Sequence, residues 1–197
     1  MPVGTGDWIT SIIKAESSGK EFDYVSNPEF LREGAAVNDF LYPDRVVVGA
    51  SSKKAFKEMR EVYRSLYLNE TPIVETGVET AEMIKYASNS FLALKISYIN
   101  EIANLCEAVG ADVHQVAKAM GKDGRISSKF LHPGPGFGGS CFPKDIQALY
   151  SLGKEKNVTL NTVEATIKTN ANQKNVALEK ILNLVDNDIN ESRVAIL

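Results

Sequence analysis

The longest hydrophobic pattern in the chain covers residues 78–109, a stretch of 32 residues without glycine or proline. Apolar side chains recur there every three or four residues, which is the spacing of one face of an α-helix. They are Ile84, Ala87, Phe91, Leu94, Tyr98, Ile102, Leu105 and Val109. The pattern predicts one helix about 48 Å long, at 1.5 Å per residue. A helix of this length exceeds what one small domain covers, so we expect part of it to pack against a second copy of the chain.

Shorter patterns before this helix alternate between helix and strand. Helical patterns are found at Asp7–Glu16 and from Ser51 to Leu66, with Ser51 as the expected cap. Strand-like patterns are found at Phe22–Ser26, Val46–Val48 and Ile73–Val74. The β-branched run Val46–Val48 is typical of a buried parallel strand. The alternation therefore predicts a parallel, Rossmann-like sheet, of which residues 1–76 hold a remnant.

The chain after the long helix is expected to be helical as well. Asp112 is placed to cap a short helix that ends at Gly121, and helical patterns cover Asp145–Lys156 and Asn161–Val185. The fold class we predict is an α/β remnant followed by a mainly α-helical domain built on one long helix. Its expected divisions are residues 1–76, 77–190 and 191–197, the last being the first strand of a further domain. Both ends look cut, so we expect a truncated piece of a longer protein.

Composition and charge exclude several classes of partner. The net charge of the 197 residues is -3, which gives no surplus for binding nucleic acid or an anionic membrane. The apolar runs are too short to span a membrane. Two cysteines without paired spacing are typical of a reducing cytoplasm, and two distant histidines make no metal pattern. We therefore expect a cytoplasmic protein with no nucleic-acid, membrane or metal partner.

A glycine-rich segment, Gly134–Gly139, leads into Ser140-Cys141-Phe142-Pro143-Lys144-Asp145. Ser140 is a suitable helix cap and Pro143 suits the first turn of a helix. The positive end of that helix and the charge of Lys144 would both favour the thiolate, which is the nucleophilic form of cysteine. We therefore predict that Cys141 is a catalytic nucleophile, whereas Cys106, inside the long apolar pattern, is a small buried hydrophobe.

Two other interpretations of this segment are weaker. The spacing Gly134-x-Gly136-x-x-Gly139 matches a dinucleotide-binding pattern, but no strand precedes it and no strand ending in a carboxylate follows it. A cysteine hydrolase or acyltransferase would need a histidine partner, and His132 lies in a loop without an orienting acid. We reject the first interpretation and disfavour the second.

Further polar residues lie where binding chemistry is expected. Lys85 and Asn89 are four apart on one helix face, which indicates either a polar pocket or a solvated stripe. Glu29 and Glu33 follow a predicted strand, on the side where ligands bind in α/β sheets, although a capped surface turn would look the same. Asp145 follows Cys141 by one helical turn.

Asp145 is placed either to orient a water molecule or to stabilise the start of the helix. Arg125 lies in a loop rich in glycine and serine, and its guanidinium suits a phosphate or sugar oxygen.

Three segments together resemble the UDP-glucose/GDP-mannose dehydrogenase family. They are Ser26–Gly34 with Pro43–Gly49, Lys85–Asn89 with Lys95–Glu101, and Gly136–Asp145. The resemblance covers essentially the whole chain, and the Pro-Gly-Pro-Gly lead into the cysteine is closer to the UDP-glucose branch. It implies an oxidoreductase with NAD as cofactor that oxidises UDP-glucose to UDP-glucuronate in a four-electron reaction, through a thiohemiacetal and a thioester on Cys141.

The resemblance also assigns roles to single residues. Lys85 and Asn89 match residues that stabilise an oxyanion, and Asp145 and Glu29 match the acid/base groups. Glu33, Cys141 and Lys144 match positions beside the cofactor. Arg125 matches an arginine that reaches the sugar nucleotide of a partner subunit. The expected contacts of the UDP-sugar are Glu29, Phe30, Leu31, Lys85, Asn89, Arg125, Phe130, Leu131, His132, Phe137 and Gly138. Relatives often carry lysine where this chain has His132.

Two parts of the family pattern are missing from the sequence: the glycine fingerprint of the NAD domain, and the UDP-binding domain beyond its first strand. We therefore expect the isolated chain to be inactive, although it derives from an enzyme. Other possibilities are a GDP-mannose or other nucleotide-sugar 6-dehydrogenase, and a non-catalytic dimerisation fragment. A homodimer through the long helix is expected in each case.

Overall fold

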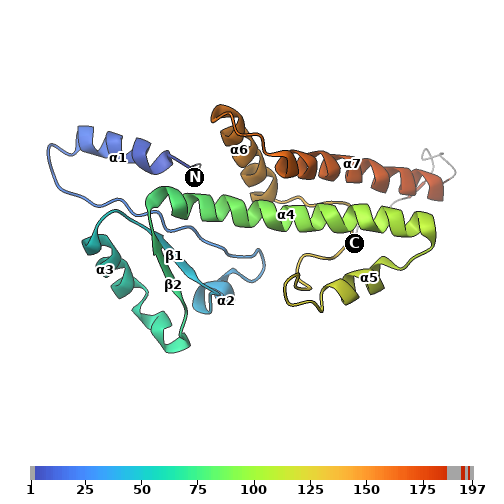
Figure 1. Ribbon diagram of the computed structural model, residues 1–197, viewed down its shortest axis with the longest axis horizontal. Coiled ribbons are helices and arrows are strands. Elements are labelled where there is room, and N and C mark those ends of the chain that lie inside the picture. The colour runs from blue at the N-terminus through green and yellow to red at the C-terminus, as the bar shows by residue number, and fades with distance from the viewer. Residues whose placement is uncertain (1–2, 186–191, 194, 196–197) are drawn as a thin grey trace. The chain divides into compact units, whose positions relative to one another are not determined.

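The computed structural model describes residues 3–185, 192, 193 and 195. In chain order the elements are α1 (Thr5–Glu16), α2 (Ala36–Leu41), β1 (Val46–Gly49), α3 (Lys53–Val62), the 3-10 helix η1 (Arg64–Asn69), β2 (Ile73–Thr76), α4 (Val78–Val109), α5 (Val113–Met120), α6 (Cys141–Glu155) and α7 (Asn161–Leu184). The chain divides into two compact units, Met1–Ser88 and Asn89–Leu197, and the division falls inside α4 (Figure 1).

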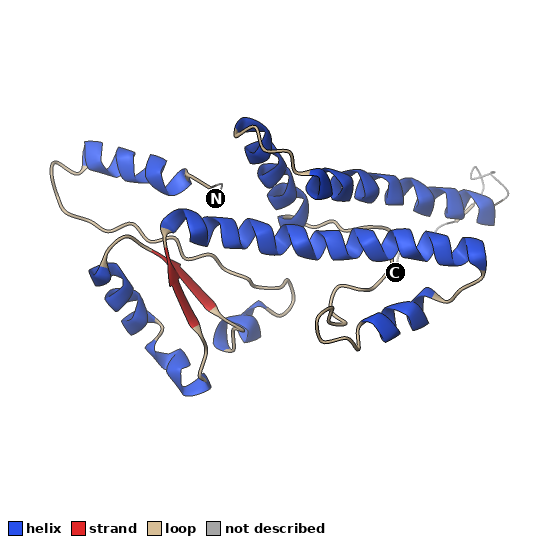
Figure 2. Ribbon diagram, viewed as in Figure 1, coloured by secondary structure: helices blue, strands red, loops and turns tan. Residues whose placement is uncertain are grey.

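The first unit contains the parallel strands β1 and β2, with Val46 opposite Ile73 and Gly49 opposite Thr76 (Figure 2). All four residues of β1 are buried, as expected of a strand covered on both faces. Side chains of α3 and of the residues that follow it pack on the buried cluster of Val46, Val48 and Leu66. Gly49 lies so close to the start of α4 that a Cβ there would overlap Ala81. The predicted α/β remnant is confirmed.

The prediction of a strand at Phe22–Ser26 is wrong. Ser26 alone pairs, in an antiparallel bridge with Gly49 at 2.8 and 2.7 Å between N and O atoms. The next residue is tied to β1 by its side chain, since Asn27 Nδ2 donates to Val47 O at 2.7 Å. The sequence also misplaced the cap of α3: Ser52, one residue after the expected Ser51, accepts the hydrogen bond from Ala55 N at 3.0 Å.

The second unit consists of the remaining part of α4 and helices α5, α6 and α7. Helix α7 runs alongside α4 (Figure 1), and Ser97 Oγ donates to Thr166 O between them at 3.2 Å. Asp112 caps α5 as predicted, accepting from His114 N at 2.8 Å. Helix α4 has the predicted bounds, and α7 ends one residue before the predicted Val185. The strand predicted at 191–197 falls mostly outside the described residues, so it and the three domain bounds stay predictions.

The buried face of α4 is composed mainly of small and polar side chains. They are Ala81, Glu82, Tyr86, Asn89, Ser90, Ala93, Ser97, Ile99, Asn100, Ala103 and Cys106. Several of the bulky residues that define its apolar period are exposed instead: Phe91 is 60% exposed, Tyr98 46%, Leu105 59% and Val109 67%. Small side chains let neighbouring segments approach the helix closely, and the apolar stripe is left at the surface.

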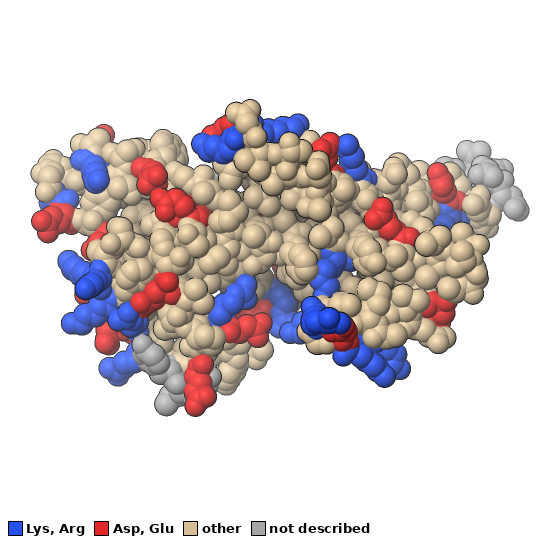
Figure 3. Space-filling model, viewed as in Figure 1, with Lys and Arg blue, Asp and Glu red and all other residues tan. Residues whose placement is uncertain are grey.

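Within the described part of the chain, no helix combines the length and the apolar character needed to cross a membrane. On the face shown in Figure 3, positive and negative side chains are interspersed.

Candidate functional site

Cys141 is the first residue of α6, and its side chain is exposed. The helix begins four residues earlier than the predicted Asp145, and Pro143 lies in its first turn. Ser140 occupies the cap position, but its side chain makes no capping hydrogen bond, so this part of the prediction is wrong. Its backbone is already helical, and Oγ lies 3.7 Å from Cys141 Sγ. The thiol is therefore accessible at the positive end of a 15-residue helix.

Asp145 lies one turn after Cys141 and is 2% exposed. Its Oδ2 accepts from Asn89 Nδ2 at 2.6 Å, and its Oδ1 accepts from Lys144 Nζ at 2.7 Å. A buried carboxylate requires such donors, because an unpaired charge away from water is costly. Three of the predicted residues of the second unit thus form one hydrogen-bonded group beside the thiol-bearing turn.

In the first unit, two of the predicted site residues, Lys85 and Glu29, contact each other. The Lys85 ammonium donates to Glu29 O at 2.5 Å and to Glu29 Oε1 at 3.1 Å. The other carboxylate oxygen, Oε2, accepts from Leu31 N at 2.6 Å, which closes the turn after Pro28. The Arg45 guanidinium lies 3.8 Å above the centre of the Phe30 ring. Glu33 is exposed on the same segment.

The loop that carries Arg125 is anchored to α4 by Lys95. The Lys95 ammonium donates to Ile126 O at 2.9 Å, to Ser127 O at 3.2 Å and to Lys129 O at 2.5 Å. Burial lowers the pKa of Lys95 from its ordinary value. The Arg125 side chain is 90% exposed and bonds Asp123, which lowers the pKa of that carboxyl group. Arg125 therefore lies at the surface of a loop that is fixed to α4.

Aromatic rings line the segment between this loop and α6. The Phe142 ring contacts Phe130 and Phe137 edge to face, with centroids 6.0 and 6.1 Å apart. Leu131, predicted to contact the sugar nucleotide, is 3% exposed and packs with Ile99 and Ala117, so its side chain belongs to the core. His132 and Gly138 are exposed.

Two family models match the chain. Residues 1–67 match the NAD binding domain of the UDP-glucose/GDP-mannose dehydrogenase family, and residues 79–172 match its central domain. The chain belongs to this family.

The similar proteins agree with this assignment. The UDP-glucose 6-dehydrogenase of Rhizobium meliloti is 51% identical over 100% of this chain and 46% of its own length. The UDP-glucose 6-dehydrogenase TuaD of Bacillus subtilis is 48% identical over 94% of this chain and 40% of its own length. The structure of a UDP-glucose dehydrogenase from Pyrobaculum islandicum has a TM-score of 0.90 at 37% identity, covering 94% of this chain and 43% of that one. The chain therefore spans less than half the length of these family members.

Sequence reasoning assigned no role to several polar residues that hold this family member together. Asn100, Asn170 and Gln173 bind backbone atoms of residues 134–137, as described below. Glu82 is 3% exposed and accepts from Gly4 N at 2.8 Å and Gly6 N at 3.0 Å, which fixes the start of α1. The sequence did hold a signal for Glu82, Asn100 and Asn170. Each is a polar residue inside a long helical pattern, on the helix face that is buried against other segments.

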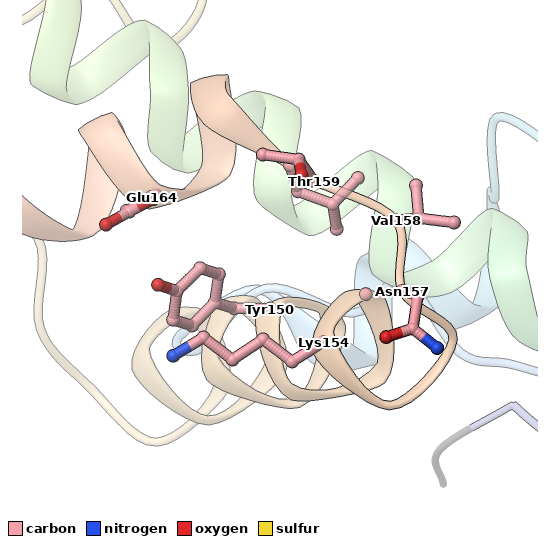
Figure 4. A pocket seen from close by; sticks show the side chains of 8 residues that line it. Tyr150, Lys154, Asn157, Val158, Thr159 and Glu164 are labelled. Carbon is pink, nitrogen blue, oxygen red and sulfur yellow. The ribbon is translucent and has the colours of Figure 1, made fainter.

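No group of three metal-ligating side chains occurs among residues 3–185, 192, 193 and 195. A pocket of about 290 Å³ lies where α6 ends and α7 begins (Figure 4). In its wall, Lys154 lies over the Tyr150 ring. A hydrogen bond from Lys168, with a smaller contribution from Tyr150, lowers the pKa of Glu164. The pocket includes none of the predicted site residues.

Proposed function

We propose that the protein containing this chain is an NAD-dependent UDP-glucose 6-dehydrogenase, which oxidises UDP-glucose to UDP-glucuronate with Cys141 as the nucleophile. The observation that carries the proposal is an exposed thiol at the first residue of α6, one turn before a buried carboxylate that bonds Asn89 and Lys144. The names of the similar proteins support UDP-glucose as the substrate.

The residues of the proposed site suit the second half of this reaction, in which an aldehyde is oxidised to a carboxylic acid. The Cys141 thiolate adds to the aldehyde carbon of the oxidised sugar, forming a C–S bond and an oxyanion, and oxidation of this adduct gives a thioester. Asn89 keeps a second amide N–H besides the one given to Asp145, and Lys85 carries a positive charge, so both suit an oxyanion. Water then cleaves the thioester, releasing the carboxylate and the thiol, and Asp145 or Glu29 accepts the proton from water.

NAD would supply the oxidant by accepting a hydride at each of the two oxidation levels. Among the described residues, neither strand of the sheet is followed by a glycine-rich turn, since Ala50-Ser51-Ser52 follows β1 and a single glycine, Gly77, follows β2. Such a turn is what holds a dinucleotide pyrophosphate. The described residues alone therefore do not form the site of the whole cofactor. Glu33, Cys141 and Lys144 remain the proposed contacts at its nicotinamide end.

The test is a chimera in which this chain replaces the matching 46% of the Rhizobium meliloti enzyme. With UDP-glucose and NAD we expect sustained NADH formation, two per sugar, and none in the same chimera with Cys141→Ser. A chimera that folds cooperatively but oxidises no UDP-glucose, or a Cys141→Ser chimera with unchanged turnover, contradicts the proposal. GDP-mannose in parallel assays tests the alternative substrate.

We also propose that two copies of the chain associate through α4. Phe91, Tyr98, Leu105 and Val109 support this, because their spacing of seven, seven and four residues puts them along one exposed stripe of the helix. An apolar stripe of this length favours a partner surface over water. Both cysteines are free thiols, which fits a reducing compartment, and we propose the cytoplasm.

A further inference from the structure

Three side-chain amides bind the backbone of the glycine-rich segment that leads into α6. Asn100 Oδ1 accepts from Gly134 N at 2.7 Å, and Gln173 Nε2 donates to Gly134 O at 3.0 Å. Asn170 Oδ1 accepts from Phe137 N at 2.7 Å, while Asn170 Nδ2 donates to Phe137 O at 3.0 Å. The backbone N–H and C=O groups of Gly134 and Phe137 thus have hydrogen-bond partners, although neither residue lies in a strand or helix. We call Asn100, Asn170 and Gln173 the amide clamp.

The clamp is buried, and the segment it holds is shaped to it. Asn100 is 0% exposed, and Asn170 and Gln173 are below 10%. Gln173 is itself held by Asn104, whose Nδ2 donates to its Oε1 at 3.0 Å. Gly136 has a φ of 109° and approaches Asn170 so closely that a Cβ there would lie 2.7 Å from Oδ1. Glycine is required at this position both for its backbone angle and for the contact.

The side chain of Phe137 links the clamp to the thiol-bearing turn. Phe137 is buried with Ala93 and Ile146, and its ring meets that of Phe142 edge to face. Phe142 is the residue after Cys141 in the first turn of α6. Buried hydrogen bonds to a loop backbone are retained in a low-dielectric surrounding, so they fix the loop firmly. A displacement of Phe137 therefore acts on the turn that carries Cys141.

We propose that Asn170 is a positioning residue for Cys141. With Asn100 and Gln173 it fixes residues 134–137. Through the contact between the Phe137 and Phe142 rings it holds in place the first turn of α6, which carries the thiol. The inference rests on the proposed function, because it takes Cys141 as the reacting group. It assigns Asn170 no contact with the sugar nucleotide.

The direct test compares Asn170→Leu with Asn172→Leu in the purified 197-residue chain. Leucine has a similar size and removes both hydrogen bonds, and Asn172 is an exposed residue of the same helix. In Asn170→Leu we expect amide hydrogen exchange at Phe137 to quicken at least tenfold. Iodoacetamide labelling of Cys141 at neutral pH should slow three- to tenfold, because a frayed first turn no longer holds the thiol at the positive end of α6.

Cys106 separates positioning from general damage. It is buried, so a variant that merely unfolds more often would label faster there, whereas loss of positioning slows Cys141 and leaves Cys106 unchanged. Unchanged exchange at Phe137 and unchanged Cys141 labelling in Asn170→Leu would overturn the proposal. The same slowing in Asn172→Leu would overturn it too.

Two measurements keep the test decisive should Asn170→Leu fail to fold. In the unaltered chain the Phe137 amide must exchange at least tenfold more slowly than those of Gly138 and Gly139, and equal rates refute the clamp. In Asn170→Asp the ionised carboxylate cannot donate to Phe137 O but still accepts from Phe137 N, so the Phe137 amide should stay protected in a folded variant. A Phe137 amide that exchanges there as fast as those of Gly138 and Gly139 would refute the clamp. A native chain in which Cys141 labels no faster than Cys106 would count against the proposed nucleophile, while the exchange data would still test the clamp.

Discussion

The amide of Asn89 holds the buried carboxylate of Asp145 at 2.6 Å, although the two residues are 56 positions apart. Asn89→Leu keeps the volume but leaves a buried carboxylate oxygen without its donor. We expect the free energy of unfolding to fall by about 1–3 kcal/mol, measured by urea denaturation. Lys156→Met is the control, because both partners of its ion pair with Glu155 are exposed, 65% and 68%, and such a pair is worth less than about 1 kcal/mol. Equal losses in both variants would contradict this account.

Glu82 should affect the titration of a neighbouring phenol. The pKa of Tyr24 is raised from its ordinary value, first by burial and then by the negative charge of Glu82. In Glu82→Gln the charge is removed and the burial remains, so the pKa of Tyr24 should fall but stay above the ordinary value. NMR of ring-labelled tyrosine measures this, with Glu79→Gln, at an exposed position of the same helix, as the control. A midpoint that does not move in Glu82→Gln would refute the assignment.

Stability should depend on pH through Glu164. Its pKa is lowered chiefly by the hydrogen bond from Lys168. A carboxyl group whose pKa is lower in the folded state stabilises the protein above its unfolded pKa, and this contribution is lost as pH falls through the folded pKa. Glu164→Gln should therefore be less stable than the native chain near neutral pH and should lose less stability on acidification. Thermal melts from neutral to acidic pH, with Glu179→Gln as the control, measure both effects.

The exposed stripe of α4 should control association. Tyr98→Glu combined with Leu105→Glu places two charges in the proposed contact, where they would lose hydration, so we expect a monomer at tens of micromolar. Sedimentation velocity measures this, and Lys118→Glu, on α5, controls for added negative charge. A native chain that is monomeric under the same conditions would exclude the homodimer.

The helices were largely predictable from the sequence, because their signals are local. The bounds of α4 follow from the absence of glycine and proline in residues 78–109 and from Gly110, whose φ of 72° ends the helix. The pattern at Phe22–Ser26 failed, because a strand also needs a neighbouring edge, and β1 offers its second edge to Ser26 alone. The short helix α2 was not predicted at all.

The site residues were identified from motifs, but their partners could not be predicted. Lys85, Asn89, Cys141 and Asp145 are recognisable as chemistry-bearing residues in a single sequence. The amide clamp depends on contacts between residues 33 to 39 positions apart, which no helical or strand period encodes. The residues that bury α4 within the chain could not be predicted from its period, because bulky apolar residues dominate a periodicity count, whereas small residues form the close contacts.

The polar residues of α4 have a consequence for the order of folding. Glu82 meets Gly4 across 78 residues, and Ser97 meets Thr166 across 69, so segments from both directions of the chain close onto one central helix. Closing such long loops is slow, while a helix without glycine or proline forms from local contacts alone. At a synthesis rate of about 5–20 residues per second, the start of α1 emerges roughly 4–16 seconds before its partner on α4 exists. During that interval the backbone N–H groups of Gly4 and Gly6 have no native acceptor and remain bonded to water.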